Sequence, residues 1–219
     1  MPPAVALLIA VALAYAIGSI PFGYLLARSI QGIDIRQHGS GNIGASNVGR
    51  VLGAKWGILA LVLDLFKALL PTWLLPLLLV HDPEWAGHAS IACGVAAIIG
   101  HMYPCWLWLR GGKGVASALG VVAYLAPTST AIAFGVFTLT ILVWRIVSLS
   151  SMLAAISFAA AHVILNRDHL WTPSGWSLTA FSLAIPTLIV LRHRSNLVRL
   201  WRGEEPRYRT AKERAGNVG

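Results

Sequence analysis

Long apolar runs alternate with short polar segments along this chain of 219 residues. Several runs reach or approach the ~20 apolar residues that a helix needs to cross ~30 Å of hydrocarbon. They cover approximately residues 3–27, 54–80, 86–104, 115–126, 128–144, 149–166 and 176–191. Because a membrane-spanning helix satisfies its own backbone hydrogen bonds, we predict an all-α, polytopic membrane protein with seven transmembrane helices.

The fourth run is the shortest, since residues 115–126 would form a helix only ~18 Å long. Residues 115–144 could instead form one long tilted span that bends slightly at Pro127. With seven spans, all of the 17 Lys and Arg residues except Lys67 and Arg167 fall on one side of the membrane. The positive-inside rule therefore favours seven spans over six, with the N-terminus outside and the C-terminus in the cytoplasm.

The composition agrees with a membrane protein. Hydrophobic residues make up 57% of the chain and charged residues 11%, and the mean hydropathy is +0.70. A soluble domain of this size could not bury so much apolar surface. The first run lacks a preceding basic region, so we expect a retained span and not a signal peptide. We expect one domain, residues 1–219, with a polar cytoplasmic tail from about residue 203.

The spacing of residues along the chain does not indicate a disulfide, a metal site or a nucleotide-binding site. Cys93 and Cys105 would lie ~18 Å apart on one helical run, which is too far for a disulfide. Neither the ligand spacings of metal sites nor that of a nucleotide-binding P-loop is present. We therefore expect no metal, no cofactor and no nucleic-acid partner.

Residues 38–50, HGSGNIGASNVGR, are a candidate anion-binding loop between the first two runs. Glycines let backbone N–H groups approach a ligand closely, and Arg50 can bind phosphate through two parallel hydrogen bonds. The other candidate binding residues of this loop are Gly39, Ser40, Gly41, Asn42, Gly44, Ser46 and Asn47. A glycine-rich turn between helices would share this composition, so both interpretations stay open.

A second candidate is RGGKG, residues 110–114, which precedes the fourth run. A helix N-terminus favours negative charge, and Gly112 and Lys113 lie beside it. The alternative is a tight loop carrying two ordinary cytoplasmic charges.

Polar residues near or inside the spans extend the candidate site. Asp64 and Lys67 are three residues apart, so they share one helix face and should point into the bundle. A structural ion pair and direct contact of Lys67 with a ligand are both compatible with this spacing. His101 is a further polar candidate at the cytoplasmic end of the third span.

Two more candidates follow the seventh run. His193 and Asn196 are expected on one helical face, where His193 can act as a base or donor and Asn196 can orient a hydroxyl or a phosphate. By contrast, His88 and His162 are expected to be bundle histidines whose hydrogen bonds are satisfied within the protein.

Taken together, HGSGNIGASNVGR, GHMYPCWLWLRGGKGVAS and HRSNLVRLWRGEE resemble the three cytoplasmic motifs of the bacterial acyl-phosphate:glycerol-3-phosphate acyltransferases, the PlsY family. Their order and spacing fit nearly the whole chain. The resemblance implies seven transmembrane helices in the bacterial inner membrane and an active site facing the cytoplasm. It also implies transfer of a fatty acyl group from acyl phosphate to the sn-1 hydroxyl of glycerol 3-phosphate, which yields lysophosphatidate and phosphate for phospholipid biosynthesis.

The resemblance and the residue chemistry together suggest specific roles. The residues expected to be catalytic are Ser40, Arg50, Lys113, His193 and Asn196. Those expected to bind substrate or phosphate are Gly39, Gly41, Asn42, Gly44, Ser46, Asn47, Gly112, Lys67, His101, Ser148, Ser151 and Glu205. The choice between Ser148 and Ser151 stays open, and Glu205 is the counterpart of the glutamate in the family's GxE ending.

The chain departs from the family pattern at three positions. Ser46 stands where threonine is usual and keeps the hydroxyl. Gly49 replaces a larger residue next to Arg50, and Ser195 stands where glutamate is frequent. These changes bear on the placement of Arg50 and argue against a base at position 195.

Other functional classes fit part of the pattern. A membrane transporter for an anionic phosphorylated metabolite would explain the basic loops, but charge gathered on one face and the lack of an evident inverted repeat fit passage across the membrane poorly. An acyl-CoA enzyme with a His-x-x-x-x-Asp dyad is disfavoured, because no histidine has an aspartate five residues later.

Overall fold

The computed structural model describes residues 2–208, and helices are its only regular secondary structure within that range. The helices are α1 (Pro3–Gly18), α2 (Phe22–Gln31), α3 (Ala45–Val51), α4 (Ala54–Leu79), α5 (Pro83–Met102), α6 (Val115–Leu125), α7 (Pro127–Trp144), α8 (Val147–Leu165), α9 (Trp176–Arg192) and α10 (Arg194–Trp201). Two 3₁₀ turns lie at Ile35–Gln37 and Cys105–Leu107. The all-α prediction is therefore confirmed for the described residues.

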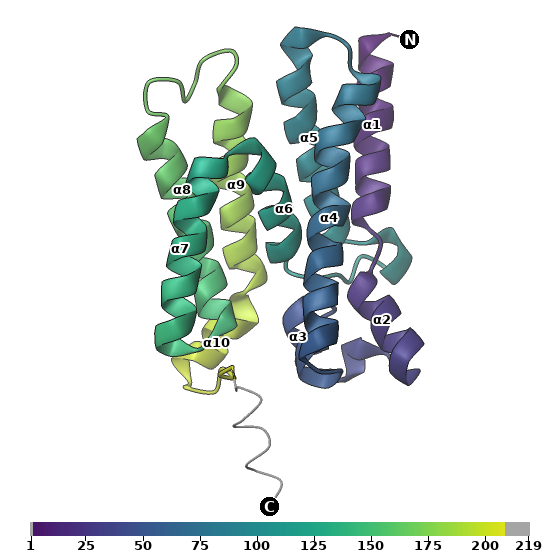
Figure 1. Ribbon diagram of the computed structural model, residues 1–219, viewed down its shortest axis with the longest axis vertical. Coiled ribbons are helices and arrows are strands. Elements are labelled where there is room, and N and C mark those ends of the chain that lie inside the picture. Colours follow the sequence, from purple (N-terminus) through teal and green to yellow (C-terminus); the bar gives the residue numbers. More distant parts are fainter. Residues whose placement is uncertain (1, 209–219) are drawn as a thin grey trace, which may run out of the picture.

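Five segments in the described part of the chain are long and apolar enough to cross a membrane. They are Pro3–Gln31, Ala54–Leu79, Pro83–Leu107, Pro127–Trp144 and Val147–Leu165. The pair α9 and α10, bent by 55° at its break, would make a sixth, whereas α6 is a shorter apolar helix of 11 residues. Helices α6 and α7 meet at Ala126 and fold back on one another, so residues 115–144 do not form one tilted span (Figure 1).

The helices form two groups with α6 between them (Figure 1). In one group α1, α4 and α5 pack together, and in the other α7 and α9 both contact α8. Small residues allow the close approach of α1 and α5, because a Cβ on Gly18 would collide with the backbone of Ala97 and one on Gly100 with that of Tyr15. Such packing of small residues is the usual basis of helix association in membranes.

The first apolar run is interrupted where a single helix was expected. Helix α1 ends at Gly18 and α2 begins after Pro21, which cannot donate a backbone hydrogen bond. The Nζ atom of Lys67 lies 2.7 Å from the carbonyl oxygen of Ile20 and satisfies that group at the break. A broken helix is tolerated at membrane depth when a neighbouring side chain supplies the missing partner in this way.

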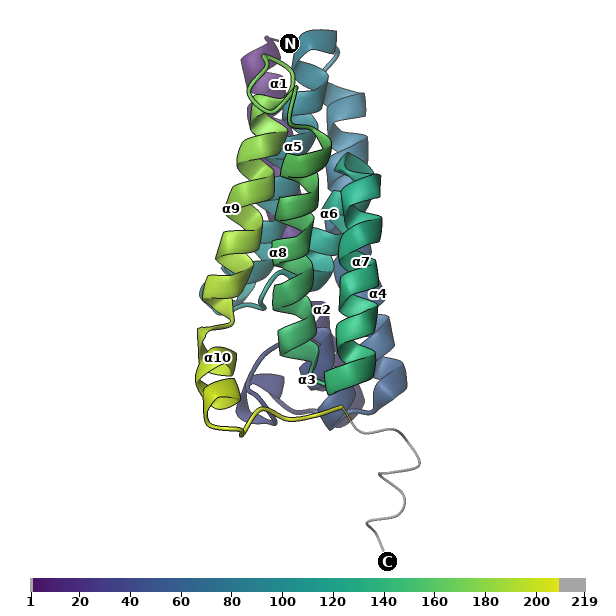
Figure 2. The same ribbon diagram turned by 90° about the vertical axis from the view of Figure 1, so that its left-hand side faces the viewer.

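Three short helices gather at the end of the molecule away from the N-terminus (Figure 1). Helices α2, α3 and α10 all lie there, although they are far apart in the sequence. The segment after α10 crosses the base of the molecule toward α7, where the backbone N–H of Tyr208 donates to the carbonyl of Arg145 at 2.6 Å (Figure 2).

Candidate functional site

The carboxylate of Glu205, in the segment after α10, connects α8 and α10 at this end of the molecule. Ser148 at the start of α8 and Asn196 in α10 each donate to Oε1 of Glu205 at 2.6 Å. Arg199 donates from Nε to Oε2 of Glu205 at 2.7 Å. Both carboxylate oxygens are therefore paired, and the Glu205 side chain is only 7% exposed. This arrangement fixes α10 against α8.

Lys113 joins the RGGKG loop to this network by donating from Nζ to Oδ1 of Asn196. The pKa of Lys113 is lowered to about 8, mainly by burial; the negative charge of Glu205 opposes this shift, and the positive charges of Arg199, Arg192 and Arg50 contribute to it. Arg50 is thus close enough to act on Lys113. Arg50, in the candidate anion-binding loop, is therefore one of the cations that act electrostatically on the RGGKG loop.

The pKa of Glu205 reflects the same network. Burial alone would raise the pKa of this carboxyl, but hydrogen bonds from Ser148, Asn196 and Arg199 outweigh burial and hold the pKa below its usual value. Glu205 is therefore a carboxylate at neutral pH and accepts all three hydrogen bonds.

The RGGKG loop is held against the end of α5. The backbone N–H of Gly112 donates to the carbonyl of His101 at 3.1 Å, and a Cβ at Gly112 would collide with the His101 ring. Arg192 at the end of α9 donates from Nη2 to the carbonyls of Gly112, Gly111 and Met102 at 2.9 to 3.3 Å. The loop that carries Lys113 is therefore held by residues at the ends of both α5 and α9.

Behind this loop lies a buried polar cluster in the bundle interior. Lys67 pairs with Asp64, with 2.8 Å between Nζ and Oδ1, and His101 approaches the same oxygen with Nδ1 at 3.5 Å. All three residues are buried. In the described structure, the Lys67 ammonium group is paired inside the protein, with the Asp64 carboxylate and the Ile20 carbonyl.

Asn47 organises the loop of residues 38–50. Its Oδ1 accepts from the backbone N–H of Ser40 at 2.8 Å, and its Nδ2 donates to the carbonyls of His38 and Asn42, both at 2.9 Å. Both amide hydrogens of Asn47 are occupied, so the side chain shapes the loop. The loop also needs glycine at position 39, where φ is +60° and a Cβ would collide with Asn47.

The remaining candidates of this loop differ in availability. Asn42 accepts from the backbone N–H of Gly44 at 2.8 Å, which tightens the turn. Ser40, Ser46 and Arg50 are exposed. These three side chains are therefore accessible from outside the loop.

His193 lies at the bend between α9 and α10, and not within one continuous helix as the i, i+3 spacing suggested. Its ring is buried, and Nδ1 lies 2.8 Å from the carbonyl oxygen of Ile189. A carbonyl can only accept, so Nδ1 carries a proton. In the neutral ring, Nε2 is then an acceptor for a proton.

Several assignments depend on the tertiary structure. Ser151 bonds to the carbonyl of Val147 in its own helix, whereas Ser148 reaches Glu205. Sequence reasoning also missed Arg192 and Arg199, which hold the RGGKG loop and Glu205. In the sequence, the only indication of a role for these two arginines was their position beside the HRSN motif. That position does not reveal which groups they bond.

Residues 8–203 match the family model described as glycerol-3-phosphate acyltransferase. The glycerol-3-phosphate acyltransferase of Anaeromyxobacter sp. (strain Fw109-5) is 43% identical over 208 residues, which cover 92% of this chain and 96% of that protein. The protein of the same name from Thermosynechococcus vestitus is 41% identical over 213 residues, covering 94% of this chain and 97% of the relative.

Two crystal structures of PlsY (YgiH), an integral membrane glycerol 3-phosphate acyltransferase, are similar to this fold. The glycerol 3-phosphate form aligns with a TM-score of 0.82 at 36% identity and covers 94% of this chain and 97% of its own. The lysophosphatidic acid form aligns with a TM-score of 0.79 at the same identity and covers 93% and 96%.

Proposed function

The chain belongs to the glycerol-3-phosphate acyltransferase family, and we propose that it transfers a fatty acyl group from acyl phosphate to the sn-1 hydroxyl of glycerol 3-phosphate. The products are lysophosphatidate and inorganic phosphate. The observation that carries the proposal is the network in which Lys113, Asn196 and Glu205 join the loops beside Arg50. Both substrates carry phosphate, which suits a site where cations outnumber carboxylates.

In the proposed reaction, the glycerol hydroxyl oxygen attacks the acyl carbon, and the bond from that carbon to the phosphate oxygen breaks. The phosphate leaves with the electron pair. Acyl phosphate is a mixed anhydride and is already activated, so the main tasks of the enzyme are proximity and stabilisation of negative charge. Arg50 and Lys113 supply this charge in the proposal, and the exposed hydroxyls of Ser40 and Ser46 add hydrogen bonds to the substrates.

The hydroxyl proton needs an acceptor. In the proposal His193 receives it at Nε2, because the carbonyl of Ile189 keeps the other ring nitrogen protonated. A substrate phosphate is the alternative acceptor. Asn196 orients Lys113, and Glu205, itself held by Ser148, holds Asn196. Glu205 and Ser148 are therefore positioning residues in this proposal.

We also propose a topology for this chain in the bacterial inner membrane. Helices α1, α4, α5, α6, α7, α8 and α9 are the seven crossings, with the N-terminus outside and the candidate site facing the cytoplasm. Helix α6 is shorter than the hydrocarbon core of a bilayer is thick. It packs against α4, α5, α7 and α9, which shield it from the lipid and so avoid the cost of this mismatch. Residues 1–219 act as one domain in this proposal.

The decisive experiment supplies purified protein with glycerol 3-phosphate and either acyl phosphate or acyl-CoA. Lysophosphatidate formed only with acyl phosphate is the expected result, and digestion of the product with a positional lipase should place the acyl group at sn-1. Formation from acyl-CoA alone would overturn the donor assignment. Uptake of labelled glycerol 3-phosphate into vesicles without acylation would instead indicate a transporter.

A further inference from the structure

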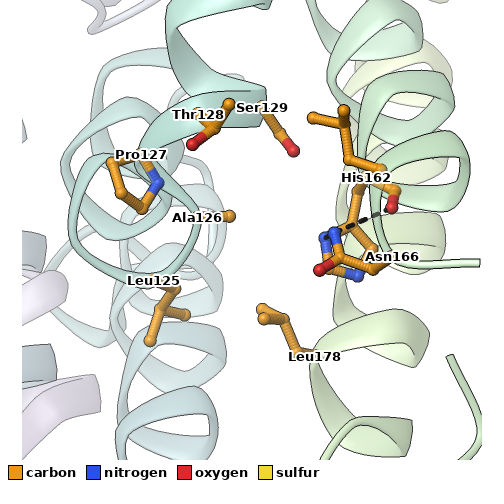
Figure 3. Close-up of a pocket in the computed structure, with 9 residues that line it drawn as sticks. Leu125, Ala126, Pro127, Thr128, Ser129, His162, Asn166 and Leu178 are labelled. Carbon is orange, nitrogen blue, oxygen red and sulfur yellow. Dashed lines mark hydrogen bonds between the residues drawn. The ribbon is translucent and has the colours of Figure 1, made fainter. Parts of the chain in front are cut away.

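A cavity lies far from the candidate site, between the α6–α7 turn, the end of α8 and the start of α9 (Figure 3). Its volume is about 350 Å³, and we call it the α7 pocket. It is lined by Leu125, Ala126, Pro127, Thr128, Ser129, His162, Leu165, Asn166 and Leu178. Ser148 and His162 lie near opposite ends of α8, and 14 residues of helix separate them by about 21 Å.

The cavity follows from the short length of α6. With only 11 residues, α6 turns back at Ala126 before it reaches the level of the α8–α9 connection (Figure 1). The ends of α8 and α9 extend beyond this turn, and the space above it is incompletely filled. Polar groups of α7 and α8 border that space.

His162 offers a hydrogen-bond donor to the α7 pocket. The Nδ2 atom of Asn166 donates to the backbone carbonyl of His162 at 2.9 Å, which identifies that atom as the amide nitrogen. The same nitrogen lies 3.4 Å from Nδ1 of His162 and can only donate to it, so the ring proton belongs on Nε2. His162 is 3% exposed, and its Nε2 has no partner within residues 2–208.

Ser129 offers a second donor from the opposite wall. Its side chain points from the first turn of α7 across the cavity toward His162 and Asn166 (Figure 3). Ser129 is only 2% exposed, and in the described part of the chain its hydroxyl makes no hydrogen bond. The N-terminus of the 18-residue helix α7 adds backbone N–H groups that have no partner within the helix.

Neither the Ser129 hydroxyl nor His162 Nε2 is among the side-chain atoms that residues 2–208 bury without a hydrogen-bond partner, so both atoms stay accessible to a molecule in the pocket. The His162 ring, the Ser129 hydroxyl and the α7 N-terminus all present hydrogens. No Lys, Arg, Asp or Glu lines the pocket. The complementary ligand therefore carries an acceptor oxygen without needing a fully charged partner.

We propose that the α7 pocket binds the oxygen-bearing head of a fatty acyl chain, either the carboxyl group of a free fatty acid or the ester carbonyl of a bilayer lipid. Ser129 and His162 donate to that oxygen. Leu125, Leu165 and Leu178 contact the first methylene groups of the chain. The pocket is separate from the candidate site, so this binding does not depend on the proposed acyl transfer.

The test uses palmitic acid that carries a photoreactive diazirine beside its carboxyl group. The full-length protein is placed in nanodiscs of diether phosphatidylcholine, which has no ester carbonyl, and the crosslinked peptides are identified by mass spectrometry. We expect crosslinks in residues 125–129 and 162–178 that unlabelled palmitate competes away. Ser129→Ala and His162→Gln should each weaken labelling about tenfold, as expected for the loss of one hydrogen bond.

The control is Ser157→Ala on α8, because the Ser157 hydroxyl bonds to the carbonyl of Leu153 in its own helix, outside the pocket. Labelling of this variant should equal that of the unchanged protein, and thermal unfolding checks that all variants are folded. Weaker labelling in diester than in diether nanodiscs would identify bilayer ester carbonyls as the occupant, and equal labelling would identify free fatty acid.

Three outcomes would overturn the proposal. One is an absence of crosslinks to the lining segments, which would indicate a water-filled pocket. Another is labelling that neither pocket variant weakens. A third is equal competition by hexadecane and palmitate, because hexadecane has no acceptor oxygen.

Discussion

Lys113 donates a hydrogen bond from Nζ to Oδ1 of Asn196, a residue 83 positions later in the chain. Lys113 precedes α6, whereas Asn196 belongs to α10 beyond three further helices. The other end of the Asn196 amide donates to Glu205. The position of the Lys113 charge therefore depends on α10 and on the segment that follows it.

The lowered pKa of Lys113 predicts a specific pH dependence. Its ammonium group loses a proton near pH 8, where an ordinary lysine would remain charged. We expect kcat/KM for glycerol 3-phosphate to fall as the pH rises through about 8, because this parameter reports the free enzyme and the neutral amine attracts phosphate poorly. Lys113→Arg should have a lower rate but should lack this fall, since the guanidinium stays charged. A flat profile for the unchanged protein would contradict the role of the Lys113 charge.

Arg50 is predicted to bind phosphate through its planar guanidinium. Arg50→Ala should abolish turnover, and Arg50→Lys should recover only part of it, because an ammonium group cannot form two parallel hydrogen bonds. Steady-state kinetics with both substrates measures the effect. Lys55→Ala is the control, since Lys55 is also exposed and contacts the ring of Trp56. Equal losses in the Arg50 and Lys55 variants would point to general electrostatics.

His193 is predicted to accept the hydroxyl proton. If it does, His193→Ala should lower kcat by about 10²-fold or more, which is the usual contribution of a general base. A fall of less than about tenfold would assign His193 to positioning and leave a substrate phosphate as the acceptor. Single-turnover measurements separate this chemical step from product release.

Glu205 is predicted to stabilise the fold as well as the site. Glu205→Gln weakens its pairing with Arg199, and we expect a loss of about 1–3 kcal/mol in the free energy of unfolding. Glu204→Gln is the control, because Glu204 is exposed. Thermal unfolding in detergent measures both variants, and equal melting temperatures for the two would contradict this prediction.

The lowered pKa of Glu205 also sets the sign of a pH effect on stability. The folded protein holds this carboxyl in its ionised form more strongly than the unfolded chain, where the ordinary pKa is 4.5. The stabilisation is therefore complete above about pH 4.5 and disappears as the pH falls through the lowered value. The stability difference between the unchanged protein and Glu205→Gln should shrink over that acid range.

Asn47 is predicted to maintain the loop of residues 38–50. Asn47→Ala removes the hydrogen bonds of its side chain to the Ser40 N–H and to the His38 and Asn42 carbonyls, of which His38 still accepts from the Gly41 N–H, so amide hydrogen exchange in residues 38–44 should accelerate. Asn47→Asp keeps the acceptor for Ser40 but loses both donated hydrogen bonds, and its effect should lie in between. Asn42→Ala, which removes only the bond to Gly44, is the milder comparison. Unchanged exchange in Asn47→Ala would contradict the role of this residue.

The positions of the long helices were predictable from the apolar runs. The predicted run 128–144 matches Pro127–Trp144, and 54–80 matches Ala54–Leu79. The agreement has a physical cause, because lipid cannot satisfy backbone groups and an apolar stretch at membrane depth must form a helix. The break at Pro21 was missed, because the side chain that satisfies it, Lys67, lies 47 residues from Ile20.

The chemistry of the site was predictable to a lesser degree. Lys113 and Asn196 were candidates because polar residues gather in a few segments between apolar runs. Their mutual contact, the hydrogen bond from Ser148 to Glu205, and the hydrogen bonds of Arg199 depend on how α8 and α10 meet. Likewise, His162 was expected to be satisfied within the bundle, yet one ring nitrogen faces the α7 pocket without a partner in the described residues.

The amino-acid sequence by itself determined that this chain is a helical membrane protein, which segments carry its polar chemistry and which family its motifs resemble. Those properties follow from local composition, because transfer into lipid acts on each segment separately. Only the tertiary structure decided that Glu205 holds Asn196, that Asn47 shapes its own loop and that a cavity opens beside Ser129. These depend on contacts between segments distant in sequence, and side-chain directions at such contacts arise only when the helices pack.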